Sequence, residues 1–142
     1  MKSIQILLVE DNEGDIVLTL EALYDAKIKN EVSVVRDGAE ALDFLNDRKA
    51  VPHLLPDLIL LDINLPKIDG KEVLQTIKTD EKLKKIPVVM LTTSSSELDI
   101  TESYNNHANC FITKPVDLDK FFEVVKVIED FWITIVKLPS KE

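Results

Sequence analysis

The sequence has a single cysteine, Cys110, among its 142 residues, so no disulfide can form within the chain. Disulfide frameworks are typical of small secreted domains, and the lack of one fits a reducing compartment. Cys110 lies in an apolar stretch, which favours a buried structural thiol. We therefore expect a cytoplasmic protein.

Positive charge is scarce relative to negative charge. The 17 lysine and arginine residues are outnumbered by 26 aspartate and glutamate residues, which gives a formal net charge of −9. Nucleic acids and anionic lipids are bound through positive surfaces, so this balance argues against both as non-specific partners. An acidic excess is compatible with binding of a divalent cation.

Long apolar runs, linkers, repeats and low-complexity segments are also absent. No apolar stretch approaches the roughly 20 residues that a membrane-spanning helix needs. The first residues turn acidic too soon for a signal peptide. The length suits one domain with a sizeable core.

Short apolar runs alternate with segments of helical periodicity along the chain. The runs predict strands at residues 4–9, 32–35, 58–61, 87–91 and 110–112. The weaker, alternating run at 32–35 is typical of an edge strand, and the run at 58–61 of a strand buried on both faces. This alternation predicts a parallel sheet with helices on both faces, joined by right-handed crossovers.

Capping signals mark two of the predicted helices. Asp37 with Glu40, and Asp69 with Glu72, have the spacing of a capping box at a helix start. Residues 46–56 are expected to form a proline-containing loop. The other helices are predicted around Ile16, Leu20 and Leu23, at residues 94–106, and from Asp117 onward.

Polar residues follow four of the predicted strands. They are Glu10-Asp11, Asp62, Thr92-Thr93-Ser94 and Thr113-Lys114-Pro115. Since the carboxyl ends of parallel strands share one edge of a sheet, these residues should lie together, where ligands bind in such folds. Taken singly, each has a plain alternative: Asp62 starts a turn, Glu10-Asp11 caps the first helix, and Lys114 is a surface lysine.

Three carboxylates in one pocket repel one another unless something neutralises them. Lys114 supplies one positive charge to Glu10, Asp11 and Asp62. A hard divalent cation supplies the rest, and Mg²⁺ suits a site with few carboxylates and several waters. The backbone carbonyl of Asn64 is a further candidate ligand.

In this order, the motifs resemble the receiver domain of bacterial response regulators. They are Ile6-Leu7-Leu8-Val9-Glu10-Asp11-Asn12, Leu60-Leu61-Asp62-Ile63-Asn64-Leu65-Pro66 with Asp69-Gly70, Leu91-Thr92 and Lys114-Pro115. The resemblance implies a flavodoxin-like doubly wound (βα)5 parallel sheet of strand order 2-1-3-4-5, with an extended C-terminal helix. It also implies one receiver domain over residues 1–142 and no output domain.

The resemblance assigns roles to single residues. Asp62 would accept a phosphoryl group from the phosphohistidine of a sensor histidine kinase, with no other enzymatic activity than this transfer and slow autodephosphorylation. Lys114 and Thr92 would bind phosphoryl oxygens. Phosphoryl transfer depends mainly on positioning and on neutralising those oxygens, so the roles are physically reasonable. The implied Mg²⁺ ligands are Glu10, Asp11, Asp62 and the Asn64 carbonyl.

Three positions depart from the family pattern. Thr93 follows Thr92 where a small Ala or Gly is usual, and its bulk would hinder the water that attacks the phosphoryl group. Glu10 stands where Asp is commoner, and its longer side chain alters the contact with the cation. Phe111 stands where many members carry Tyr, so a switch formed by Thr92 and Phe111 would be steric. Plain core packing of Phe111 is the alternative.

The final helix is apolar nearly all round, which is typical of a helix buried on both sides. We expect it to form a homodimer or a kinase docking surface; a tail folded onto its own core is the alternative. Residues 128–132 and 136–139 resemble small stand-alone response regulators that partner phytochrome-type kinases. The candidate surface residues are Phe121, Phe122, Ile128, Phe131 and Trp132.

Three other functions compete with this interpretation. A phosphatase of the haloacid dehalogenase type needs an Asp two residues after the nucleophile, where this chain has Asn64. A flavodoxin-type flavin carrier needs a phosphate loop rich in Ser, Thr and Gly, but residues 10–15 are acidic. A receiver-like module that is never phosphorylated is disfavoured by the intact set of polar residues.

Overall fold

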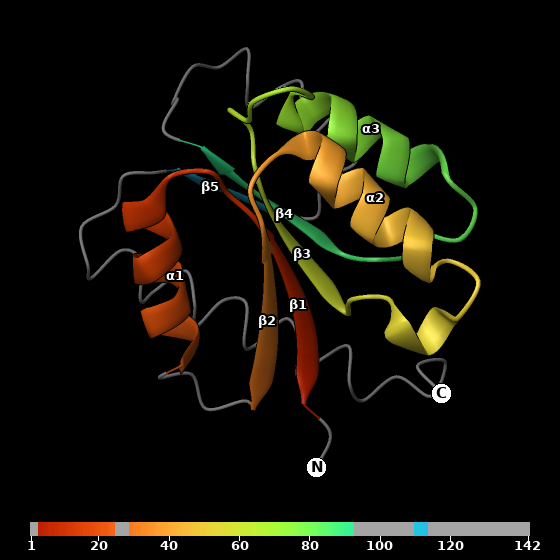
Figure 1. The fold of residues 1–142 in the computed structure, drawn as a ribbon, viewed down its shortest axis with the longest axis horizontal. Helices are drawn as coiled ribbons and strands as arrows, with labels where there is room; N and C mark the ends of the chain where they lie inside the picture. The colour runs from red at the N-terminus through yellow and green to blue at the C-terminus, as the bar shows by residue number, and fades with distance from the viewer. Residues whose placement is uncertain (1–2, 25–28, 93–109, 114–142) are drawn as a thin grey trace.

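The sheet has the strand order that the resemblance to receiver domains implies. The computed structural model describes residues 3–24, 29–92 and 110–113, and its five parallel strands lie in the order β2-β1-β3-β4-β5 (Figure 1). The strands are β1 Ile4–Val9, β2 Asn30–Val35, β3 Leu58–Asp62, β4 Val88–Thr92 and β5 Cys110–Thr113. The helices are α1 Glu13–Tyr24, α2 Gly38–Arg48 and α3 Gly70–Thr79, with a short 3-10 helix η1 at Pro52–Leu54. The flavodoxin-like doubly wound fold is confirmed, while the helices predicted at 94–106 and from Asp117 lie outside the described residues.

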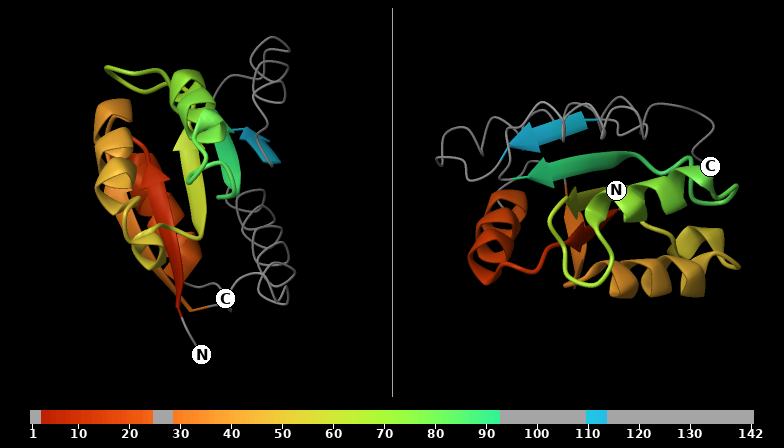
Figure 2. Two further views of the ribbon diagram at one scale, coloured as in Figure 1. Left: turned by 90° about the vertical axis from the view of Figure 1, so that its right-hand side faces the viewer. Right: turned by 90° about the horizontal axis from the view of Figure 1, so that it is seen from above.

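Two apolar layers bury the two faces of the sheet. Successive side chains of a strand point to opposite faces, so Leu58 and Leu60 pack in one layer and Ile59 and Leu61 in the other. Helix α1 covers the first layer, and α2 and α3 cover the second (Figure 2). This double burial explains why β3 is a continuous apolar run, and why its last residue, Asp62, lies at the centre of the sheet edge.

The predicted loop at residues 46–56 is wrong in part. Helix α2 continues to Arg48, whose guanidinium lies 3.6 Å from the Phe44 ring centroid and whose Nη1 donates to the Phe44 carbonyl oxygen at 3.2 Å. Pro52 then begins η1, because its fixed φ suits the first position of a helical turn. The polar composition hid one more turn of helix and a 3-10 turn.

Capping of α2 and α3 follows the predicted residues with altered details. Asp37 accepts from the Glu40 backbone N–H at 2.8 Å, but the Glu40 carboxylate accepts from the N–H of Arg36 and not of Asp37. Asp69 accepts from the Lys71 N–H at 3.4 Å, one residue earlier than the box spacing predicts. Both helices nevertheless begin where the sequence predicts.

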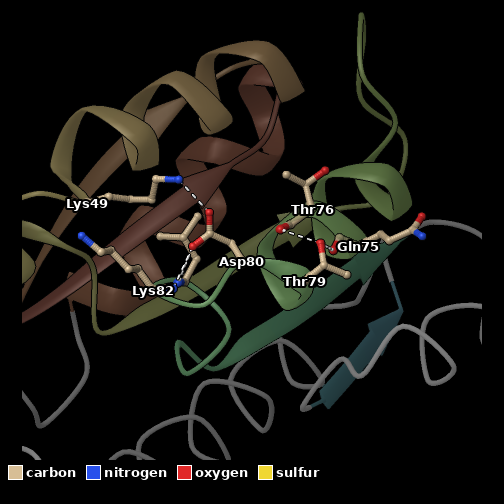
Figure 3. A network of polar contacts seen from close by, with 7 residues as sticks. Lys49, Gln75, Thr76, Thr79, Asp80 and Lys82 are labelled. Carbon is tan, nitrogen blue, oxygen red and sulfur yellow. Dashed lines mark hydrogen bonds and ion pairs between the residues drawn. The ribbon is translucent and has the colours of Figure 1, made fainter.

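Paired charges join α2 and α3 at their carboxyl ends. Lys49 Nζ lies 2.7 Å from Asp80 Oδ2, and Asp80 Oδ1 accepts from the N–H groups of Lys82 and Leu83 (Figure 3). Lys78 Nζ donates to the Ile86 carbonyl at 2.7 Å. These contacts lie at the amino ends of the strands, on the side opposite Asp62. None of the helices in the described ranges has the length and apolarity to cross a membrane.

Candidate functional site

The strand register brings the predicted site residues to one edge. Leu61 lies opposite Val9, and Asp62 lies opposite Leu91, the residue before Thr92. The pairing extends past the strands, since the Ile63 N–H donates to the Leu91 carbonyl at 2.8 Å. The first residue after β1, Glu10, is held in the same way by the Val35 carbonyl oxygen, 3.0 Å from its amide nitrogen.

Three carboxylates meet at this edge. One oxygen each of Glu10, Asp11 and Asp62 can be chosen so that all three lie within 4.8 Å of one another. Glu10 is fully buried and Asp62 is 4% exposed, whereas Asp11 is exposed. Burying carboxylates side by side is unfavourable unless compensating charges or hydrogen bonds stabilise them. A donor set made only of carboxylate oxygens fits a hard divalent cation.

Helix α1 is capped by Asn12, a residue that was not among the predicted caps. Its side-chain oxygen accepts from the Asp15 backbone N–H at 2.9 Å. The Glu10 carboxylate accepts from the Asn12 N–H at 3.2 Å. Asn12 thus provides a side-chain acceptor for the first turn of α1. The signal was available, because Asn is among the preferred cap residues.

The loop after Asp62 is folded tightly against the strand end. The Gly70 N–H donates to the Ile63 carbonyl at 2.9 Å, and the Asn64 N–H lies 3.4 Å from Asp62 Oδ1. A Cβ on Gly70 would collide with the Asp62 carbonyl oxygen and lie 2.7 Å from the Ile63 Cα. Gly70 is thus required for the close approach of two backbones, and not only as a strand breaker.

The other predicted site residues lie partly or wholly outside the described residues. Thr92 ends β4 opposite Thr113 in β5, so its backbone lies at the same edge as Asp62, but its side chain is not described. Phe111 lies in β5 opposite Met90, and again only its backbone is described. Lys114 and the final-helix residues lie outside the described residues; the latter are Phe121, Phe122, Ile128, Phe131 and Trp132.

The doubly wound sheet with an acidic cluster at the carboxyl ends of its central strands defines a class of signalling domain. Residues 6–126 match the family described as the response regulator receiver domain, and the chain belongs to that family. Its members act in two-component signalling, where a kinase phosphorylates them.

Individual relatives place the chain among small response regulators. It is 47% identical over 136 residues to response regulator Rcp1 from Synechocystis sp., which covers 95% of this chain and 92% of Rcp1. It is 41% identical over 128 residues to the probable methanogenesis regulatory protein FilR2 of Methanothrix harundinacea, covering 90% and 83% of the two chains. Among solved structures, the phosphorylated cyanobacterial phytochrome response regulator RcpA superposes with a TM-score of 0.85 at 51% identity, over 97% of this chain and 99% of RcpA. The Mn²⁺-bound form of Rcp1 gives a TM-score of 0.82 at 47% identity, over 96% and 99%.

Proposed function

We propose that Asp62 accepts the phosphoryl group and that Glu10, Asp11 and Asp62, with the Asn64 backbone carbonyl, hold Mg²⁺ for the transfer. The observation that carries this proposal is the meeting of three carboxylates within 4.8 Å at the tip of a central strand. Two of them, Glu10 and Asp62, are buried, where clustered carboxylates need compensating charge. The Mn²⁺-bound form of the relative Rcp1 supports a divalent cation at such a site.

Each residue has a definite task in the proposed transfer. One carboxylate oxygen of Asp62 attacks the phosphorus atom, so that a P–O bond forms while the P–N bond to the kinase histidine breaks and its electron pair stays on the imidazole nitrogen. The Asn64 N–H, 3.4 Å from Asp62 Oδ1, orients the carboxylate. When bound, the cation neutralises charge on the phosphoryl oxygens. Thr92, and Lys114 directly after the end of β5, would bind those oxygens as the family resemblance implies.

The proposed partner is a phytochrome-type sensor histidine kinase. The support is the similarity to RcpA, which is a phytochrome response regulator, over nearly the whole of both chains. We also propose that the apolar segment from Asp117 onward, which the sequence predicts to be a helix, mediates homodimerisation or kinase docking. Analytical ultracentrifugation tests the dimer: a monomer at high concentration, both with and without a phosphodonor, would refute it.

The phosphoacceptor assignment is tested by intact mass spectrometry after incubation with acetyl phosphate and Mg²⁺. The wild type should gain one phosphoryl adduct, and Asp62→Asn should gain none. Asp69→Asn is the matched control, because Asp69 is an exposed carboxylate in the same loop and asparagine keeps its capping acceptor. An adduct that persists in Asp62→Asn would refute the assignment. Absence of any adduct on the wild type, with acetyl phosphate and with a kinase, would favour an unphosphorylated interaction module.

A further inference from the structure

Lys67 has an unfavourable backbone conformation in the loop that follows Asp62. Its φ is 68°, and among the described residues it is the only non-glycine with a positive φ. Lysine has neither the freedom of glycine nor the short polar side chain that helps asparagine in this region. Neighbouring contacts must therefore hold the loop in this conformation.

The Lys67 side chain reaches the first turn of helix α2. Its Nζ lies 3.5 Å from Asp37 Oδ2, while Asp37 Oδ1 accepts from the Glu40 N–H at 2.8 Å. One carboxylate thus caps α2 with one oxygen and faces the loop with the other. The Glu40 hydrogen bond, with help from the Lys67 charge, holds the pKa of Asp37 below its usual value, although burial opposes this. Asp37 is therefore negatively charged at neutral pH.

Backbone packing joins the same two segments. A Cβ on Gly38 would collide with the Ile68 carbonyl oxygen and lie 2.7 Å from the Ile68 Cβ. Ile68 also packs against the apolar layer beneath α2 and α3. On the other side, the loop is closed by the Gly70 N–H bond to Ile63. The loop is thus held between the starts of two helices, and the Lys67–Asp37 pair lies beside the Gly38–Ile68 contact.

We propose that Lys67 and Asp37 are positioning residues for the cation and phosphoryl site. Neither belongs to the acidic cluster, and both act by holding the loop that carries the Asn64 carbonyl beside Asp62. The inference rests on the proposed function, which makes that carbonyl a ligand. The Lys67 side chain is 69% exposed, so the pair adds little to global stability. Affinity for a cation is far more sensitive to small displacements of a ligand than global stability is.

The test compares dissociation constants for Mg²⁺, measured by calorimetry on the full chain. Lys67→Met removes the charge and keeps the backbone penalty, and we expect it to weaken Mg²⁺ binding by about 5- to 10-fold. Lys67→Arg keeps the charge and should restore binding. Asp37→Asn keeps a capping acceptor and should weaken binding similarly, and the double variant should be no worse than either single one. Lys84→Met is the control, since Lys84 is another exposed lysine that pairs with a carboxylate, that of Glu81, outside the loop.

Three further measurements separate positioning from a general loss of structure. The melting temperature of Lys67→Met should match that of Lys84→Met, and saturating Mg²⁺ should restore its phosphorylation rate with acetyl phosphate. Amide hydrogen exchange in the loop at 63–70 should accelerate in Lys67→Met and not in Lys84→Met. Equal Mg²⁺ affinity of Lys67→Met and Lys84→Met would overturn the proposal. A wild type that binds Mg²⁺ but takes no phosphoryl group on Asp62 would refute the proposed function, while the comparison of affinities would still decide the role of Lys67.

Discussion

Charged side chains are arranged differently at the two ends of the sheet: like charges cluster at one end, and opposite charges pair at the other. At the carboxyl ends of the strands, Glu10, Asp11 and Asp62 bring three negative charges within 4.8 Å. At the amino ends of the strands, Lys49 Nζ lies 2.7 Å from Asp80 Oδ2. The other carboxylate oxygen of Asp80 accepts a hydrogen bond from the Lys82 backbone N–H (Figure 3). Both ends are built from the same kinds of residue on the same scaffold.

This difference indicates that the charges at the amino ends of the strands contribute to stability, whereas those at the carboxyl ends are suited to binding. A paired charge at a helix end is satisfied by the folded chain alone. Clustered carboxylates repel one another, and a bound cation reduces that repulsion and so stabilises the folded state. Stability and function are therefore separable by substitution at the two ends.

Gly70→Ala, near the carboxyl ends of the strands, should have the largest effect on the free energy of unfolding. The new Cβ meets the backbone of Asp62 and Ile63, which cannot move aside without shifting β3 or α3. We expect a loss of about 2 to 3 kcal/mol in the free energy of unfolding, measured in urea. Gly14→Ala is the control, since its Cβ meets only the Asn12 side-chain oxygen at 3.3 Å and should stay within about 1 kcal/mol of wild type. Equal losses in both variants would contradict this close-approach explanation.

Neutralising the Asp62 carboxylate should change the free energy of unfolding in the opposite direction. In a chelating buffer, Asp62→Asn should raise the free energy of unfolding by about 1 to 2 kcal/mol, because two charges repel less than three. Adding Mg²⁺ should stabilise the wild type more than the variant, as binding to the folded state requires. Asp69→Asn should change neither the free energy of unfolding in the chelating buffer nor the stabilisation by Mg²⁺. If Asp62→Asn is less stable than wild type in the chelator, the cluster is not strained by repulsion.

Breaking the Lys49–Asp80 ion pair, at the amino ends of the strands, should reduce stability without affecting the acidic cluster. Lys49→Met removes a partner of a half-buried pair, whose side chains are 31% and 23% exposed, and should lower the free energy of unfolding by about 0.5 to 1 kcal/mol. Its Mg²⁺ dissociation constant and phosphorylation rate should equal those of wild type. A change in Mg²⁺ affinity would mean that the two ends are coupled.

The smallest effect concerns pH at the same pair. The hydrogen bond from Lys49, helped by the N–H groups of Lys82 and Leu83, lowers the pKa of Asp80 despite the opposing effect of burial. A carboxyl whose pKa is lower in the folded chain stabilises the fold above its unfolded pKa, and this contribution is lost as pH falls through the folded value. The stability difference between wild type and Asp80→Asn should therefore be full at pH 6 and shrink below about pH 4. A difference that stays constant from pH 6 to pH 3 would contradict this linkage.

Much of the architecture was readable from local pattern. The continuous apolar run of β3 predicted a strand buried on both faces, and parallel topology then required its carboxylate to lie with those after β1. Asp37 and Asp69 predicted two helix starts because capping depends on neighbours along the chain. The end of α2 was missed, since stacking of Arg48 on Phe44 does not show in composition.

The sequence by itself determined the element order, the parallel sheet and the identity of the carboxylates at its edge, because periodicity and residue type act locally. Only the tertiary structure decided how closely those carboxylates approach, and that Gly38 and Gly70 must lack a Cβ. It also decided that Lys67 lies opposite Asp37, 30 residues earlier in the chain. Such contacts join segments distant in sequence, and their geometry follows from packing around the whole sheet edge.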